Sequence, residues 1–208
     1  MARFLHRPAN PGRDGFVLTH GAGGNANSGL LIALGNALSG AGFTVVRYNL
    51  PFRQQRPFGP PRPTDGARSR EGLKNEVSSL KKQVGGNVFL GGHSYGGRQA
   101  SMLCAEEAGL AEGLLLLSYP LHAPGKLDQP RTKHLPDLKT PTLFVHGTRD
   151  PFGSIAEMEA ALKLVGGRTK LLVVENAGHD LGFKGKSKRE DLAAGILAAF
   201  NELIRVDQ

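Results

Sequence analysis

The sequence predicts a single α/β domain over residues 1–208, built as a three-layer α/β/α sandwich around a mostly parallel sheet of about six strands. Short apolar runs alternate along the chain with segments of helical spacing, which is typical of strands joined by crossover helices. These runs are almost continuously apolar, as expected where helices cover both faces of a sheet. Glycine accounts for 29 of the 208 residues and gathers at the ends of these runs, where tight turns are needed.

The expected elements follow from periodicity and from the positions of glycine and proline. We expect strands at residues 16–20, 43–49, 87–91, 114–117, 142–146 and 170–175. We expect helices at about residues 28–40, 70–84, 95–109, 155–165 and 192–204. Two proline-rich loops, 50–66 and 119–141, leave the carboxyl ends of strands, and the second has room for a short helix. Since ligands bind at the carboxyl ends of such sheets, both loops are expected to frame the site.

Composition limits the class of protein. A chain of this length buries enough surface to fold without a staple, and its one cysteine, Cys104, excludes an internal disulfide. No signal-peptide pattern and no apolar run of transmembrane length is present. We therefore expect a cytoplasmic protein without membrane insertion. The net charge of +8 allows a nucleic-acid binder as an alternative. The scattered basic residues and the absence of Trp favour a solvated basic surface, so no nucleic-acid partner is expected.

The segment from Gly92 to Gly96, Gly-His-Ser-Tyr-Gly, fits the pattern G-x-S-x-G. It directly follows an expected strand and precedes an expected helix, which is the context of a nucleophile elbow. The two glycines allow the sharp turn, and the amino end of the helix favours developing negative charge. The sequence therefore predicts Ser94 as a nucleophile.

A serine hydroxyl needs a base, and the base needs a carboxylate that orients it. His179 follows the last expected strand, and Asp150 follows the strand before it. The chain order Ser94, Asp150, His179 is the order found in this type of site. Asp180 is the alternative carboxylate, but its position next to His179 in the chain disfavours it.

The oxyanion of such a reaction needs backbone N–H donors. We expect one from Tyr95, directly after the nucleophile, and one from Ala22 in the glycine-rich loop after the first strand. Gly21 is the alternative to Ala22. The same loop could be a phosphate-binding loop, but it lacks both G-x-G-x-x-G and the Walker lysine.

Four arginines lie near the expected site, namely Arg53, Arg56, Arg62 and Arg98. Arg53 and Arg98 are the candidates for binding an acidic group of the substrate. The alternative is that these residues are surface charges or hold the first proline-rich loop through ion pairs. Structural roles are expected for three further residues, Cys104, His93 and His146. No residue spacing indicates a metal site, and no cofactor is expected.

The motifs around Ser94, Asp150 and His179, in this order, resemble the α/β-hydrolase superfamily. The small size and the absence of a large cap resemble its dienelactone-hydrolase-like branch. Four stretches carry a closer resemblance, to the group of small predicted hydrolases that includes testis-expressed protein 30; they are Leu18–Gly24, Asn49–Arg53, Gly91–Arg98 and Phe144–Gly153. The resemblance implies a fold without a cap domain. The chain departs from dienelactone hydrolase in having Ser94 where that enzyme has a cysteine. The short segment before Phe16 also leaves little room for the usual antiparallel first strands, so a reduced sheet is expected.

Together these observations predict a serine hydrolase that acts on small-molecule carboxylic esters, or on thioesters, through a Ser-His-Asp triad and an acyl-enzyme. The alternative is a catalytically silent binding or scaffold protein on the same fold, because fold does not guarantee activity. The acyl group, the alcohol group and the oligomeric state do not follow from the sequence.

Overall fold

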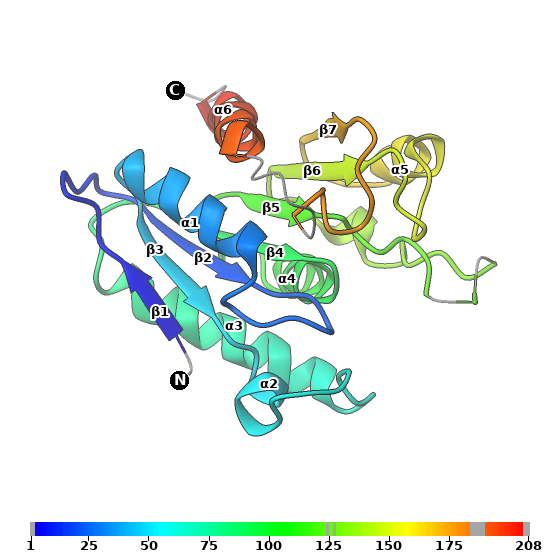
Figure 1. Cartoon of the computed structure of the whole chain (residues 1–208), viewed down its shortest axis with the longest axis horizontal. Helices are drawn as coiled ribbons and strands as arrows, with labels where there is room; N and C mark the ends of the chain where they lie inside the picture. Colours follow the sequence, from blue (N-terminus) through cyan, green and yellow to red (C-terminus); the bar gives the residue numbers. More distant parts are fainter. Residues whose placement is uncertain (1–2, 124, 127, 184–189, 206–208) are drawn as a thin grey trace.

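The computed structural model describes residues 3–123, 125–126, 128–183 and 190–205. Its centre is a seven-stranded sheet with the strand order β1-β3-β2-β4-β5-β6-β7 (Figure 1). The strands are β1 (Arg3–His6), β2 (Gly15–Thr19), β3 (Thr44–Tyr48), β4 (Val88–His93), β5 (Leu114–Leu117), β6 (Thr142–Gly147) and β7 (Thr169–Val174). Strands β2 to β7 pair in parallel, and β1 pairs antiparallel with β3. The predicted fold class is confirmed.

Strand β1 is an antiparallel first strand, for which the short segment before Phe16 is expected to leave little room; with it the sheet has seven strands, in agreement with the predicted number of about six. Its four residues are too few to show a periodic pattern, so the sequence gives no local signal for it. Pairing with β3 specifies it instead, with Arg3 opposite Tyr48 and His6 opposite Val45. The Arg47 guanidinium also lies over the Phe4 ring, 5.1 Å from its centroid.

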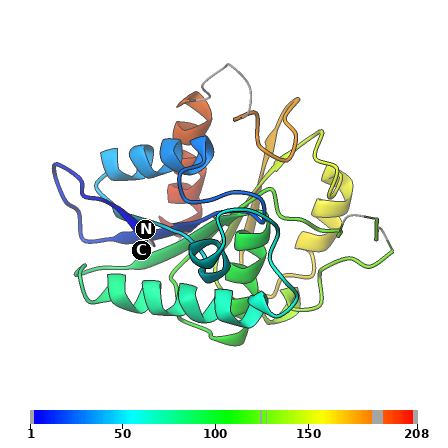
Figure 2. The same ribbon diagram turned by 60° about the horizontal axis from the view of Figure 1, so that its bottom comes forward.

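Helices cover both faces of the sheet. They are α1 (Gly29–Gly40), α2 (Pro51–Gln55), α3 (Asp65–Lys81), α4 (Tyr95–Glu106), α5 (Ile155–Leu162) and α6 (Glu190–Arg205), with a short 3₁₀ helix, η1 (Leu135–Asp137). Helices α1 and α6 lie together on one face, and α3 and α4 lie together on the other (Figure 2). The sheet therefore separates two apolar cores, one containing Phe16 and Phe200 and the other containing Leu73 and Leu103. This is the expected three-layer sandwich.

The first proline-rich loop is shorter than expected. Helix α2 occupies its start, and α3 begins at Asp65 rather than near Arg70. The prolines predict a loop here, but Pro51 lies in the first turn of α2, where its missing N–H has no helical partner to lose. The second loop contains η1, which agrees with the room expected for a short helix. Among the described residues, no helix is long and apolar enough to cross a membrane.

Candidate active site

The site forms where β4 turns into α4. Ser94 lies between the two elements with φ 50° and ψ −117°, a left-handed conformation that is costly for a residue with a side chain. Two backbone hydrogen bonds fix this turn: Ser94 N–H donates to the Leu117 carbonyl at 2.8 Å, and Arg98 N–H donates to the Ser94 carbonyl at 2.9 Å. The strand-turn-helix context predicted for Ser94 is present.

The glycines that flank Ser94 are required by close backbone contact. A Cβ atom at Gly92 would lie 2.6 Å from the backbone nitrogen of Gly97. A Cβ atom at Gly96 would collide with the carbonyl oxygen of His20, which belongs to the loop after β2. These glycines therefore let the turn close and let the β2 loop approach it.

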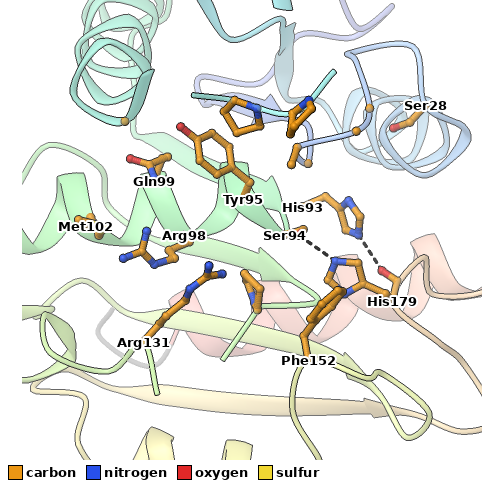
Figure 3. A pocket seen from close by; sticks show the side chains of 18 of the residues that line it. Ser28, His93, Ser94, Tyr95, Arg98, Gln99, Met102, Arg131, Phe152 and His179 are labelled. Atoms are coloured by element: carbon orange, nitrogen blue, oxygen red, sulfur yellow. Dashed lines mark hydrogen bonds between the residues drawn. The ribbon is translucent and has the colours of Figure 1, made fainter. Parts of the chain in front are cut away.

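The structure brings Ser94, His179 and Asp150 into one hydrogen-bonded chain (Figure 3 shows the contact between Ser94 and His179). Ser94 Oγ lies 2.8 Å from His179 Nε2, and His179 Nδ1 lies 2.8 Å from Asp150 Oδ2 and 3.1 Å from Oδ1. The three residues follow β4, β7 and β6, whose carboxyl ends share one edge of the sheet. Asp180, the alternative carboxylate, instead accepts a hydrogen bond from the Gly182 N–H at 3.1 Å.

Asp150 is held as a carboxylate. Burial opposes its ionisation, but hydrogen bonds from His179 and from the Phe152 N–H outweigh burial and keep the pKa of Asp150 below its ordinary value. The Phe152 N–H donates to Asp150 Oδ1 at 2.9 Å. A carboxylate at this position accepts the proton of His179 Nδ1, so His179 Nε2 is left free to accept the proton of the Ser94 hydroxyl.

His179 is held in place by two further contacts. His93 Nε2 lies 2.7 Å from the His179 carbonyl oxygen; because a carbonyl only accepts, the His93 ring donates. Burial is the main reason that the pKa of His93 falls to about 4, so His93 stays neutral near pH 7. The ring of Phe152 packs against the His179 imidazole with centroids 4.5 Å apart. His93 thus has the structural role that the sequence predicts, on the backbone of the proposed base.

The glycine-rich loop after β2 lies against Ser94. A Cβ atom at Gly21 would lie 3.3 Å from the Cβ atom of Ser94, and both Gly21 and Ala22 line the cavity beside it. Among the hydrogen bonds of the described residues, the backbone N–H groups of Ala22 and Tyr95 donate none. Two uncommitted donors therefore flank the serine.

Arg53 differs from its predicted role. It does not line the cavity and is 7% exposed. Its guanidinium donates to the carbonyls of Ala22 and Gly24 at 2.8 Å each, and to those of Arg56 and Gly59. Folding brings these carbonyls around Arg53, so it holds the β2 loop instead of facing a substrate. This is the loop-holding alternative, achieved through carbonyls rather than through an ion pair.

His20 supports the same loop from the other side. Its Nδ1 lies 2.8 Å from the Gly21 carbonyl, and its Nε2 accepts from the Leu50 N–H at 3.1 Å. These two contacts fix the neutral tautomer with the proton on Nδ1. Burial lowers the pKa of His20 to about 4, so the imidazole that supports this loop is uncharged near pH 7.

A cavity of about 1080 Å³ opens above Ser94 and His179. Both proline-rich loops line it, as expected, through residues 60–64 on one side and through Pro120, His122 and Arg131 on the other. Of the four arginines singled out in the sequence, Arg62 and Arg98 line the cavity, whereas Arg56 forms an ion pair with Asp65 at 2.9 Å. Arg131 and Phe152 also line it; the sequence indicates neither of them as a site residue, because they lie in segments without periodicity.

Cys104 and His146 lie away from the cavity lining. Cys104 is buried, and burial raises the pKa of its thiol to about 12. His146 is buried and lies 2.7 Å from the Gly153 carbonyl through Nε2, so it ties the turn that carries Asp150. Both have the structural surroundings that the sequence predicts.

Fold and site geometry together define a hydrolase-type α/β protein with a serine at its nucleophile turn. The family described as alpha/beta hydrolase domain matches residues 12–205, and this chain belongs to that family. The closer resemblance to the group that includes testis-expressed protein 30 stays a prediction.

Solved structures share this fold. A serine hydrolase homologue from Coxiella burnetii is 18% identical with a TM-score of 0.76, covering 95% of this chain and 90% of that one. Dienelactone hydrolase from Anabaena variabilis is 21% identical with a TM-score of 0.73, covering 96% and 90%. XC6422 from Xanthomonas campestris, a serine hydrolase without a lid, is 16% identical with a TM-score of 0.71, covering 99% and 90%. At these identities the likeness concerns the fold.

Proposed function

We propose that this protein is a cofactor-independent serine hydrolase of carboxylic esters, with thioesters as a second substrate class. The observation that carries the proposal is the hydrogen-bonded chain from Ser94 through His179 to the buried Asp150. Its geometry supplies the base that a serine hydroxyl lacks on its own. An intact chain beside an open cavity also argues against a silent scaffold, the alternative function on this fold.

In the proposed reaction, Ser94 Oγ attacks the acyl carbon while its proton passes to His179 Nε2. Asp150 stabilises the imidazolium that forms. The backbone N–H groups of Tyr95 and Ala22 stabilise the oxyanion, and each such donor contributes about 3 kcal/mol in comparable sites. The alcohol leaves with the proton from His179. Water, deprotonated by His179, then releases the acid and restores Ser94.

The supporting residues serve this reaction by limiting movement. Arg53 and His20 hold the loop that carries Ala22, and His93 holds the backbone of His179. A displacement of the reacting groups by about 1 Å costs roughly a hundredfold in rate. We place the activity in the cytoplasm, because the single buried thiol suits a reducing compartment.

The test is rapid mixing with short-chain 4-nitrophenyl esters. We expect a burst of 4-nitrophenol that matches the concentration of protein, followed by a slower steady state, because an acyl-enzyme accumulates. Ser94→Ala is expected to abolish the burst and to lower kcat by at least about 10³-fold. A folded wild-type protein that hydrolyses neither esters nor the matching thioesters would instead support the silent scaffold.

A further inference from the structure

One end of the cavity holds two guanidinium groups, those of Arg98 and Arg131, which we call the arginine pair. Arg98 lies in the first turn of α4, four residues after Ser94, and Arg131 belongs to the loop between β5 and η1. Both line the cavity. Figure 3 shows the two side chains extending toward one another on the same side of Ser94. Two cations from separate elements thus meet beside the proposed nucleophile.

The arginine pair has no counter-ion among the residues that the structure describes. Neither residue forms an ion pair, and Nε of Arg98 is buried without a hydrogen-bond partner. Neighbouring arginines are compensated: Arg56 pairs with Asp65, and Arg70 pairs with Glu106 at 3.0 Å. Arg98 and Arg131 thus differ from these two neighbours, and Arg62, which also lines the cavity, has no ion pair among the described residues either.

Two described residues that interact with the arginine pair, His134 and Tyr119, supply no negative charge, and Tyr119 forms a side-chain hydrogen bond with Arg98. Burial and the nearby Arg98 lower the pKa of His134 to about 4, and burial raises the pKa of Tyr119 to about 12, so both are neutral near pH 7. Burial, and then the charge of Arg98, lower the pKa of Arg131. Two like charges are thus held close together in a partly desolvated place. The carboxylate that lines the cavity is Asp180, which adjoins His179 in the chain.

Local structure does not account for the side chain of Arg131. The loop is anchored there through the backbone, since Arg131 N–H donates to the Leu121 carbonyl at 2.8 Å and the Tyr119 hydroxyl donates to the Arg131 carbonyl at 2.6 Å. Neither bond uses the guanidinium. The hydrogen bonds that anchor this loop therefore do not require a positively charged side chain at position 131.

We propose that the arginine pair binds a free anionic group of the substrate, so that the esters taken by this site also carry a carboxylate or a phosphate. The inference rests on the proposed function, whose substrate class it narrows. Planar guanidinium groups match the oxygens of both anions and bind them through paired hydrogen bonds. An anion between Arg98 and Arg131 would offset their repulsion. It would also accept hydrogen bonds from the Arg131 guanidinium, which donates none within the described residues.

The test compares matched esters at neutral pH. Mono-4-nitrophenyl adipate carries a carboxylate on the acyl side, and 4-nitrophenyl hexanoate has a methyl group in its place. 4-Acetoxybenzoate carries a carboxylate on the alcohol side, and its methyl ester is the neutral match. We expect kcat/KM for the charged member of at least one pair to be about ten- to a hundredfold higher, mainly through KM.

The variants are Arg131→Gln and Arg98→Gln, with melting temperatures as the check of folding. Each is expected to remove most of the preference for the charged ester. The matched control is Arg7→Gln. Arg7 is exposed and directly follows β1, which pairs antiparallel with β3. It therefore lies at the amino ends of the parallel strands, whereas Ser94 lies at their carboxyl ends. Arg7→Gln should keep the wild-type preference. Equal use of charged and neutral esters by the wild type would overturn the proposal.

A binding measurement separates this proposal from the proposed function. Isothermal titration of the Ser94→Ala variant with adipate and with inorganic phosphate requires no catalysis. We expect binding of at least one, lost on adding Arg131→Gln, and the tighter of the two identifies the anion as carboxylate or phosphate. Binding without ester hydrolysis by the wild type would reject the proposed function alone. Hydrolysis without anion binding or charge preference would reject the arginine pair alone.

Discussion

The two ends of the cavity differ in whether their charged side chains have partners within the protein. At the triad end, the buried Asp150 carboxylate accepts hydrogen bonds from both His179 and Phe152, and Ser94 and His179 are in contact. At the other end, Arg98 and Arg131 lie near one another without a carboxylate from the described part of the chain. The hydrogen-bonding groups of the first end thus satisfy one another within the protein, whereas the second end is the one that we propose binds an anionic group of the substrate.

Asp150→Asn tests the triad end most severely. The amide keeps the shape of the carboxylate but donates to Nδ1 of His179 and so favours the wrong tautomer. We expect kcat for a neutral ester to fall by about 10²–10⁴-fold, with little change in KM. Steady-state kinetics at neutral pH measure this effect.

Asp180→Asn is the control for the neighbouring carboxylate. A loss of kcat in Asp180→Asn as large as that in Asp150→Asn would contradict the assignment of Asp150.

Arg53→Gln and Arg131→Gln compare two arginines that differ in their partners. Arg53 donates to four backbone carbonyls, so its loss should lower the free energy of unfolding by about 2–4 kcal/mol. Arg131→Gln should change it by no more than about 0.5 kcal/mol, because its guanidinium forms no hydrogen bond or ion pair within the described residues. Urea denaturation measures both. Equal destabilisation by the two substitutions would remove the distinction between them.

Acidification tests the neutral histidines that support the triad end. His20 and His93 have pKa values of about 4 in the folded protein, against about 6.5 in an unfolded chain. The unfolded state alone takes up protons between these values, so the stability is fully present above pH 6.5 and falls as the pH drops toward 4. The slope is about 1.4 kcal/mol per pH unit for each histidine.

The measurement is the urea midpoint at a series of pH values between neutral and acid. His93→Gln, whose amide can still donate to the His179 carbonyl, should reduce the slope. A midpoint that does not change in this range would contradict the neutral, buried state of these side chains. The loss of the Asp150 contribution lies at lower pH, since its pKa is depressed in the folded protein.

The sequence predicts the three triad residues, because local pattern and chain order determine their positions. A turn motif between a strand and a helix identifies Ser94, and strand ends that share one sheet edge bring Asp150 and His179 to it. The sequence does not predict the roles of residues whose partners lie far away along the chain. The role of Arg53 cannot be predicted from the sequence, because the carbonyl groups that it binds come together only in the folded chain. Arg131 gives no signal in the sequence, because it lies in a proline-rich loop without periodicity. Strand β1 was missed since its partner strand, not its own four residues, determines it.

The most direct measurement of the central claim is labelling with a fluorophosphonate, followed by peptide mass spectrometry. The proposed mechanism predicts one adduct, on Ser94, that is absent from Ser94→Ala and forms much more slowly on Asp150→Asn. The folded wild-type protein remaining unlabelled, or carrying its adduct on another residue, would contradict the claim that Ser94 is an activated nucleophile.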